Sequence, residues 1–311
     1  MNKQKVFVIK RCLLAIPTII GVVVLIFVLT RFVPGDPVNS FVGRRADARI
    51  IEKVREEFGL DKPFFVQFFY YVKSLARGDM GYSYVSGQPV SSMIAKRFPN
   101  TLKLACTAMV LAVLSGIAMG FLSVLKPGGF IDRACMFLSV SGISIPVFWF
   151  GLILIIVFSN MLGWFPASGM GGPSYIILPA LTLATRSSAY IARITRSSVL
   201  EVLGENFVVT ARAKGLSRTK VLMKHVLKNA LIPVVTLIGI DLGSYLNGSV
   251  LTESIFGWNG IGNLALNGIM NRDYPVIMGT VLFGSVIFIF ANILVDVSYS
   301  IFNPRISYER K

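Results

Sequence analysis

A charged stretch interrupts a strongly apolar chain at Glu205-Asn-Phe-Val-Val-Thr-Ala-Arg-Ala-Lys-Gly-Leu-Ser-Arg-Thr-Lys-Val-Leu-Met-Lys-His-Val-Leu-Lys-Asn-Ala-Leu-Ile-Pro233. The residues from Glu205 to Lys214 are good helix formers and predict one short helix. Gly215 supplies a sharp turn at its end, and Ser217 is placed to cap a second helix. The segment therefore predicts a helical hairpin between apolar runs, with a surface on which another protein docks.

The competing interpretation of this hairpin is a solvated loop whose positive charge only sets membrane topology. That interpretation accounts for the charge. It does not account for the small residues Ala211, Ala213 and Gly215, which permit close approach of another chain. The docking interpretation is therefore preferred.

The composition identifies the class of protein. Of the 311 residues, 54% are hydrophobic and only 15% are charged, and the mean hydropathy is +0.69. Crossing a bilayer takes about 20 mostly apolar residues, and several runs meet that requirement. The runs are continuous rather than alternating, which favours helices over a barrel. We expect an all-α polytopic membrane protein, and disordered and secreted disulfide-rich classes are excluded.

Six transmembrane helices are predicted from the apolar runs. They cover residues 12–32, 101–125, 134–158, 175–194, 231–255 and 276–302. The first run has no small-residue cleavage site, so it is expected to be a retained anchor. The predicted divisions are residues 1–32 with the first span, an extracytoplasmic cap segment at 33–100, a membrane core at 101–302 containing the hairpin 201–230, and a tail at 303–311.

Positive charge predicts the orientation. A net charge of +16 would suggest nucleic acid in a soluble protein, but the basic residues here gather in alternate loops. These residues are Lys3, Lys5, Lys10, Arg11, Lys126, Arg133, Arg196, Arg212, Lys214, Arg218, Lys220, Lys224, Lys228, Arg305, Arg310 and Lys311. Both termini and the hairpin are therefore expected in the cytoplasm, with membrane lipid and no nucleic acid as a partner.

The external segment 33–100 carries two further patterns. Residues 48–58 have apolar side chains at helical spacing, and residues 63–75 form an aromatic-rich amphipathic piece. Two interpretations stay open. The segment is either a cap that packs on the bundle or lies among the lipid headgroups, or a docking surface for an extracytoplasmic partner.

The hairpin resembles the EAA loop of bacterial ABC importers, whose short helix sits in a groove of the nucleotide-binding subunit. Thr210-Ala-Arg-Ala-Lys-Gly-Leu216 and His225-Val-Leu-Lys-Asn-Ala-Leu-Ile-Pro233 are similar to the dipeptide, oligopeptide and nickel branch of that family. The resemblance runs nearly end to end, through Pro34-Gly-Asp-Pro37, Phe58-Gly-Leu-Asp-Lys-Pro63, Ser141-Gly-Ile-Ser-Ile-Pro146, Arg193-Ile-Thr-Arg-Ser-Ser198, Arg272-Asp-Tyr-Pro-Val276 and Asn303-Pro-Arg-Ile306.

The resemblance implies a type I ABC importer permease fold and a coupling site in the hairpin. The coupling residues are Glu205, Thr210, Ala211, Arg212, Ala213, Lys214, Gly215, Leu216 and Ser217. The sequence departs from the general motif at Val209, where a Glu is usual, and at Lys228, where a Pro is usual. A motif Glu therefore cannot be carried over as a salt-bridge partner.

Polar groups inside spans are costly and are functional candidates by default. Asp241, Ser244 and Asn247 lie in the predicted fifth span, and Arg186 lies in the fourth. These four are predicted to line the translocation pathway. Glu253 is expected nearer the outside, at the external mouth. The alternative for the fifth span is close helix packing at its glycines.

Three classes of function compete. No Gly-Lys-Ser/Thr nucleotide motif occurs, so an ATP-driven importer would take its ATP and Mg chemistry from other subunits. The resemblance implies a bacterial inner-membrane complex with a second related permease, two ATP-binding subunits and an extracytoplasmic solute-binding protein. This chain itself is expected to bind no cofactor or metal.

The runner-up is an autonomous secondary transporter or channel, which would predict inverted repeats that the sequence does not show. An intramembrane enzyme is disfavoured because the single histidine, His225, lies in the hairpin. The substrate stays open among dipeptides, oligopeptides, glutathione and nickel chelates. The short external loop before the fourth span favours a glutathione-like or short-peptide type.

Overall fold

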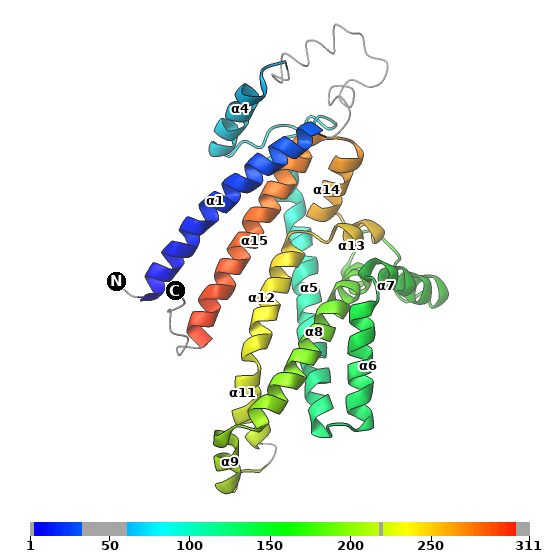
Figure 1. Ribbon diagram of the computed structural model, residues 1–311. Helices are drawn as coiled ribbons and strands as arrows, with labels where there is room; N and C mark the ends of the chain where they lie inside the picture. Colours follow the sequence, from blue (N-terminus) through cyan, green and yellow to red (C-terminus); the bar gives the residue numbers. More distant parts are fainter. Residues whose placement is uncertain (1–2, 33–60, 218–219, 303–311) are drawn as a thin grey trace.

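The computed structural model describes residues 3–32, 61–217 and 220–302, and the described part is helical (Figure 1). Its only β-type pairing is an isolated bridge between Tyr82 and Pro89. The helices form an elongated bundle, with α4 and α14 at one end and α9 at the opposite end. The elements are α1 (Lys3–Phe32), α4 (Phe64–Ala76), α5 (Val90–Leu125), α6 (Phe130–Ser144), α7 (Val147–Leu154), the π-helix Ile155–Met161, the 3₁₀-helix Pro173–Ile176, α8 (Ile177–Leu203), α9 (Asn206–Ala213), the π-helix Val221–Val226, α11 (Leu227–Ala230), α12 (Ile232–Leu246), α13 (Val250–Ile255), α14 (Ile261–Met270) and α15 (Tyr274–Phe302).

Three of the described helices, α1, α5 and α15, are long and apolar enough to cross a membrane. Two bent pairs, α6 with α7 and α11 with α12, raise that number to five if each pair is one span. The predicted fourth span is present as α8, but it is not among the five. It carries Arg186, Arg193 and Arg196, which make it less apolar than the others.

The third predicted span is wrong as a continuous helix. Residues 134–158 were predicted as one span, and the two helices within it, α6 and α7, meet at an angle of 107°. The break falls at Ile145, which is extended at φ −77° and ψ 127°, directly before Pro146. Proline lacks the amide hydrogen that would continue the helix, and it disfavours the helical conformation in the residue before it.

The fifth predicted span is also broken. It was expected to continue to residue 255, but α12 ends at Leu246 and the chain turns through Gly248, whose φ is +94°. A Cβ at Gly248 would lie 2.6 Å from the backbone nitrogen of Gly262, so only glycine allows the two segments to approach this closely. Residues 257–275, expected as a loop, contain the helix α14.

The centre of the bundle is the contact between α5 and α8, which pack along each other. Gly116 and Gly120 of α5 lie against Ile191 and Thr195 of α8. Small residues at such a contact let the two backbones come close together. This close contact with α5 sets the position of α8, and therefore of the polar side chains of α8 that line the site described below.

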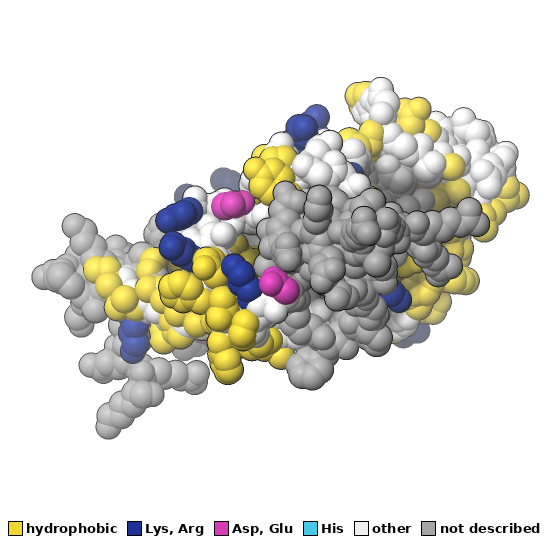
Figure 2. Space-filling model, turned by 90° about the horizontal axis from the view of Figure 1, so that it is seen from above, with side chains coloured by type: hydrophobic (Ala, Val, Ile, Leu, Met, Phe, Trp, Pro, Cys, Tyr) yellow, Lys and Arg dark blue, Asp and Glu magenta, His cyan; other side chains and the backbone are white. Residues whose placement is uncertain are grey.

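The aromatic piece predicted at 63–75 is the helix α4. Phe64, Phe68 and Tyr71 of α4 surround Phe27 of α1, with ring centroids 5.2–5.6 Å apart. The opposite face of α4 is exposed, with Phe65 at 81%. Figure 2 views the molecule from this end, where yellow hydrophobic side chains lie beside dark-blue Lys and Arg. The predicted helix at 48–58 lies outside the described residues.

Candidate functional site

The charged stretch forms the predicted hairpin. Its first helix is α9, and Glu205 precedes it in an extended conformation. Gly215 follows α9 with a φ of +78°, a left-handed conformation that glycine adopts at low cost. The second arm begins beyond residues 218–219, which lie outside the described part, and continues as the π-helix Val221–Val226 and α11.

The inner face of α9 is packed into the end of the bundle. Val208 is fully buried and Ala211 is 6% exposed. Both belong to one apolar cluster that joins α9 to α5, α8 and the second arm of the hairpin. The other buried members of this cluster are Val124, Val199, Val221, Leu222, Val226 and Ala230. These contacts hold α9 against the ends of α5 and α8, and close-packed interiors of this kind deform little.

The outer face of α9 is open and mixed in character. Phe207 is 41% exposed and Val209 is 60% exposed, and the basic Arg212 and Lys214 are exposed beside them. The Thr210 hydroxyl donates to the backbone oxygen of Asn206, within the same helix. Of the nine predicted coupling residues, only Ala211 is buried; Glu205, Thr210, Arg212, Ala213, Lys214, Gly215, Leu216 and Ser217 are exposed.

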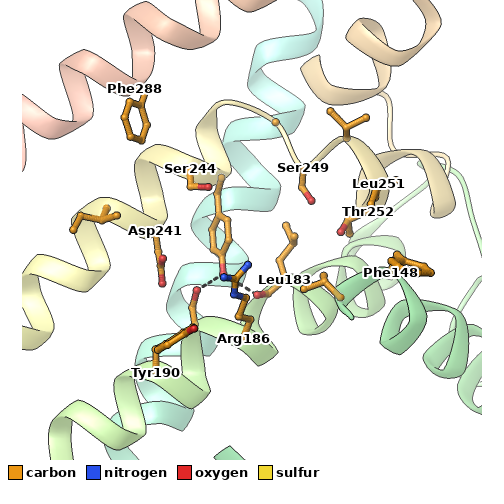
Figure 3. A pocket seen from close by; sticks show the side chains of 16 residues that line it. Phe148, Leu183, Arg186, Tyr190, Asp241, Ser244, Ser249, Leu251, Thr252 and Phe288 are labelled. Carbon is orange, nitrogen blue, oxygen red and sulfur yellow. Dashed lines mark hydrogen bonds between the residues drawn. The ribbon is translucent and has the colours of Figure 1, made fainter. Parts of the chain in front are cut away.

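A cavity of about 650 Å³ lies between α8, α12 and α13. Figure 3 shows Arg186 and Tyr190 entering it from α8, and Asp241 and Ser244 from α12. The structure thus brings together three of the four residues predicted for the pathway. The fourth, Asn247, is not in the cavity lining and lies against Gly284 of α15.

Hydroxyl groups that line this cavity connect the two helices α8 and α12. The Tyr245 hydroxyl donates to the backbone oxygen of Leu183 at 2.7 Å and lies 2.6 Å from the Ser187 hydroxyl, which can donate to it. Sequence reasoning missed both side chains. Tyr245 lies four residues after Asp241, a spacing that places both on one face of a helix and could have identified it.

The two charged groups in the cavity have few protein contacts. The guanidinium of Arg186 lies 5.8 Å from the ring centroid of Tyr190. Oδ2 of Asp241 is buried and has no hydrogen-bond partner among the described residues. Within the same part of the chain, no ion pair joins Arg186 to Asp241. Arg186 is exposed, and it attracts the Asp241 carboxylate, which also interacts with Ser187, without forming an ion pair with it.

Glu253, predicted for the external mouth, is fully buried in α13 and is not part of the cavity lining. Its carboxylate accepts hydrogen bonds from the Thr101 hydroxyl at 2.9 Å and from the Asn263 amide at 2.9 Å. Burial raises the pKa of Glu253, and these hydrogen bonds oppose that shift. The carboxylate lies at the start of α14, where a helix attracts negative charge.

One ion pair near the α5–α6 turn was also missed by sequence reasoning. Arg196 of α8 donates two hydrogen bonds to Asp132 of α6, at 2.7 and 2.8 Å. No group of potential metal ligands occurs in the described part of the chain.

Comparison with known proteins places the chain in a family. Residues 112–308 match the binding-protein-dependent transport system inner membrane component, and residues 5–105 match the N-terminal part of such a membrane component. The glutathione transport system permease protein GsiC of Escherichia coli strain K12 is 46% identical over 303 residues, covering 97% of this chain and 99% of the relative. GsiC of Shigella flexneri serotype 5b shows the same identity and coverage.

Solved structures support the fold. An inward-facing structure of the MetNI methionine ABC transporter matches with a TM-score of 0.56 at 20% identity, covering 68% of this chain and 96% of that one. A crystal structure of an amino acid ABC transporter with histidines matches with a TM-score of 0.53 at 19% identity, covering 67% and 94%. The predicted membership is confirmed: this chain belongs to the inner-membrane permease family of ABC importers and is a multi-pass protein of the bacterial inner membrane.

Proposed function

We propose that this protein is a permease subunit of an ATP-driven importer whose substrate is a glutathione-like short peptide. The similarity to glutathione permeases over 97% of the chain is the observation that carries the proposal. The similar region includes both the hairpin and the cavity between α8, α12 and α13, on which the proposed mechanism depends. The same similarity favours glutathione over the nickel chelates and longer peptides that the sequence left open.

The proposed complex contains a second related permease, two ATP-binding subunits and an extracytoplasmic solute-binding protein. In this arrangement α8 also crosses the membrane, as the fourth of six spans. Both termini and α9 face the cytoplasm, and α4 and α14 face outward. ATP and Mg are used by the partner subunits. This chain supplies half of the translocation pathway and carries out no hydrolysis itself.

The outer face of α9 supports a role in coupling. Exposed Phe207 and Val209 offer apolar contacts to a partner, and Arg212 and Lys214 add basic groups around them. Closure of the ATPase pair would push on α9, and the buried contacts of Val208 and Ala211 would pass that movement to α5 and α8. This is a rigid-body switch between two states of a packed interface.

Reconstitution tests the proposal. The chain is co-expressed with its genomic partner permease and ATPase subunits, inserted into liposomes and supplied with the solute-binding protein and labelled glutathione. Uptake that requires both ATP and the binding protein is expected. Uptake by this chain alone, driven by an ion gradient, would instead establish the secondary-transporter alternative.

A further inference from the structure

The strongest unassigned feature is the pair of opposite charges in the cavity between α8, α12 and α13. Arg186 and Asp241 come from different helices and line the same space of about 650 Å³. That volume lies within the range of ordinary small-molecule sites. Figure 3 shows the side chains of Ser244 and Tyr190 beside them.

Charges within a membrane protein are normally paired with one another, because an isolated charge is costly to remove from water. This chain follows that rule at Arg196 and Asp132, which are joined at 2.7 Å. Asp241 makes no such ion pair, although the exposed Arg186 attracts it from the other side of the cavity. Arg186 contacts the ring of Tyr190, and Asp241 Oδ2 is buried with no hydrogen-bond partner in the described part of the chain.

We infer that this cavity is a binding subsite for a zwitterionic peptide, with Arg186 taking a carboxylate and Asp241 taking the ammonium group. A ligand that carries both charges completes both interactions at once. A neutral or singly charged ligand leaves one protein charge without a partner, which costs more than the lost contact alone. The inference rests on the proposed function and names the chemistry by which the permease itself recognises its substrate.

The guanidinium suits this role. It presents a planar fork of donors that matches a carboxylate, and contact with an aromatic ring holds it in place while leaving its donors free. Tyr190, one turn from Arg186 on α8, provides that ring. The Ser244 hydroxyl, exposed on α12 next to Asp241 in the cavity, is available to peptide groups between the two charged ends.

Site protection tests this inference independently of transport. Leu251 lines the cavity and is 59% exposed, so Leu251→Cys is a reporter outside the polar contacts. The three native cysteines are replaced by alanine. The assembled complex is then labelled with N-ethylmaleimide in the presence of increasing S-methylglutathione, which has no free thiol. The half-protecting concentration measures occupancy of the cavity without the solute-binding protein.

We expect Arg186→Gln and Asp241→Asn each to raise the half-protecting concentration about tenfold, the scale of one charge-assisted hydrogen bond. Arg193→Gln is the matched control, because Arg193 is exposed on the same helix and does not line the cavity. Arg186→Lys keeps the charge without the planar fork and is expected to give an intermediate value. An intermediate value for Arg186→Lys also shows that the weaker protection in Arg186→Gln does not come from misfolding.

The ligand provides a second control. N-acetyl-S-methylglutathione lacks the ammonium charge, so its half-protecting concentration should be about tenfold higher in the protein that retains Asp241. Asp241→Asn should not raise the half-protecting concentration of this ligand any further. No protection by S-methylglutathione, or equal loss for both ligands in every variant, would overturn the inference. ATP-dependent glutathione uptake by the same complex is measured in parallel. If this uptake is measured but protection is not, the proposed function holds and only the subsite is wrong. If this uptake is absent, the proposed function itself is wrong.

Discussion

Thr101 and Glu253 are joined by a hydrogen bond of 2.9 Å across a sequence separation of 152 residues. The same Thr101 hydroxyl accepts a hydrogen bond from the Ile261 amide at 2.8 Å. One buried threonine of α5 therefore holds both α13 and the first residue of α14. Amides at the start of a helix have no partner within it, and here Thr101 and Glu253 supply the acceptors.

Thr101→Val should destabilise this junction. Valine has the same shape but no hydroxyl, so it leaves the Ile261 amide and an oxygen of Glu253 buried without this partner. The expected loss is about 2–6 kcal/mol, since each of the two buried groups left unsatisfied costs about 1–3 kcal/mol. Thermal unfolding of the purified complex measures it. Thr107→Val is the control, because the Thr107 hydroxyl bonds only to Lys103 within α5. Equal unfolding temperatures for the two variants would contradict the assignment.

Glu253 should make the stability of this junction depend on pH. Burial raises its pKa in the folded protein, so the folded state keeps the proton to a higher pH than the unfolded chain. Its contribution is then largest in acid and is lost as the pH rises through the folded-state pKa. The unfolding temperature of the wild type relative to Glu253→Gln should therefore fall as the pH rises from 4.5, the ordinary value, toward neutrality. A relative temperature that rises over this range would be inconsistent with the shift.

Gly120→Ala should weaken the contact between α5 and α8. The added Cβ would lie 2.6 Å from the backbone oxygen of Ala192 and 2.6 Å from Cβ of Thr195, and neither atom can move without shifting α8. Overpacking of this kind costs about 1–3 kcal/mol. The matched control is Gly21→Ala in α1, where no atom lies within 4 Å of the new methyl group. Unfolding of both variants in the same detergent provides the comparison, and a neutral Gly120→Ala would refute the close packing.

Asp132 and Arg196 should behave as a coupled pair. Each single substitution, Asp132→Asn or Arg196→Gln, leaves one partly buried partner without its charge-assisted bonds, at a cost of about 2 kcal/mol. The double variant should lose less than the sum of the two, with a coupling energy of about 0.5–3 kcal/mol. A double-mutant cycle of unfolding free energies measures this coupling. Additive losses would show that the pair does not stabilise the contact between α6 and α8.

The sequence predicted the helical class and the three longest apolar helices, α1, α5 and α15, because long apolar runs have few alternatives in a membrane. The predictions were wrong where a single proline or glycine interrupts a long apolar run. Pro146 bends the third run, and Gly248 ends α12 although the residues beyond it remain apolar. The helix α14 was missed because its ten residues are too short to span a bilayer and the loop around it carries little charge.

The candidate sites were predicted to different degrees. The hairpin could be found because Gly215 and its neighbours form a local pattern, and the structure gives Gly215 the expected left-handed conformation. The cavity depends on contacts between α8 and α12, which no local pattern contains. Arg186 and Asp241 were identified because a charged side chain inside a membrane is energetically costly. Tyr245 and Thr101 were missed because their hydrogen bonds join them to residues distant in sequence.

The outer face of α9 is the part of the account on which coupling to ATP depends. Phe207→Asp tests it most directly, because this side chain is 41% exposed and lies outside the buried cluster that holds α9, so its replacement should leave the fold intact. Lys126→Asp, at an exposed position on the turn after α5, is the control. The measurement is the amount of ATPase subunits retained with the purified permease, together with ATP-dependent glutathione uptake. We predict at least a tenfold loss of both for Phe207→Asp, from burying a carboxylate in an apolar contact, and no loss for Lys126→Asp. Wild-type retention and uptake in Phe207→Asp would contradict the proposal that α9 docks the ATPase subunits.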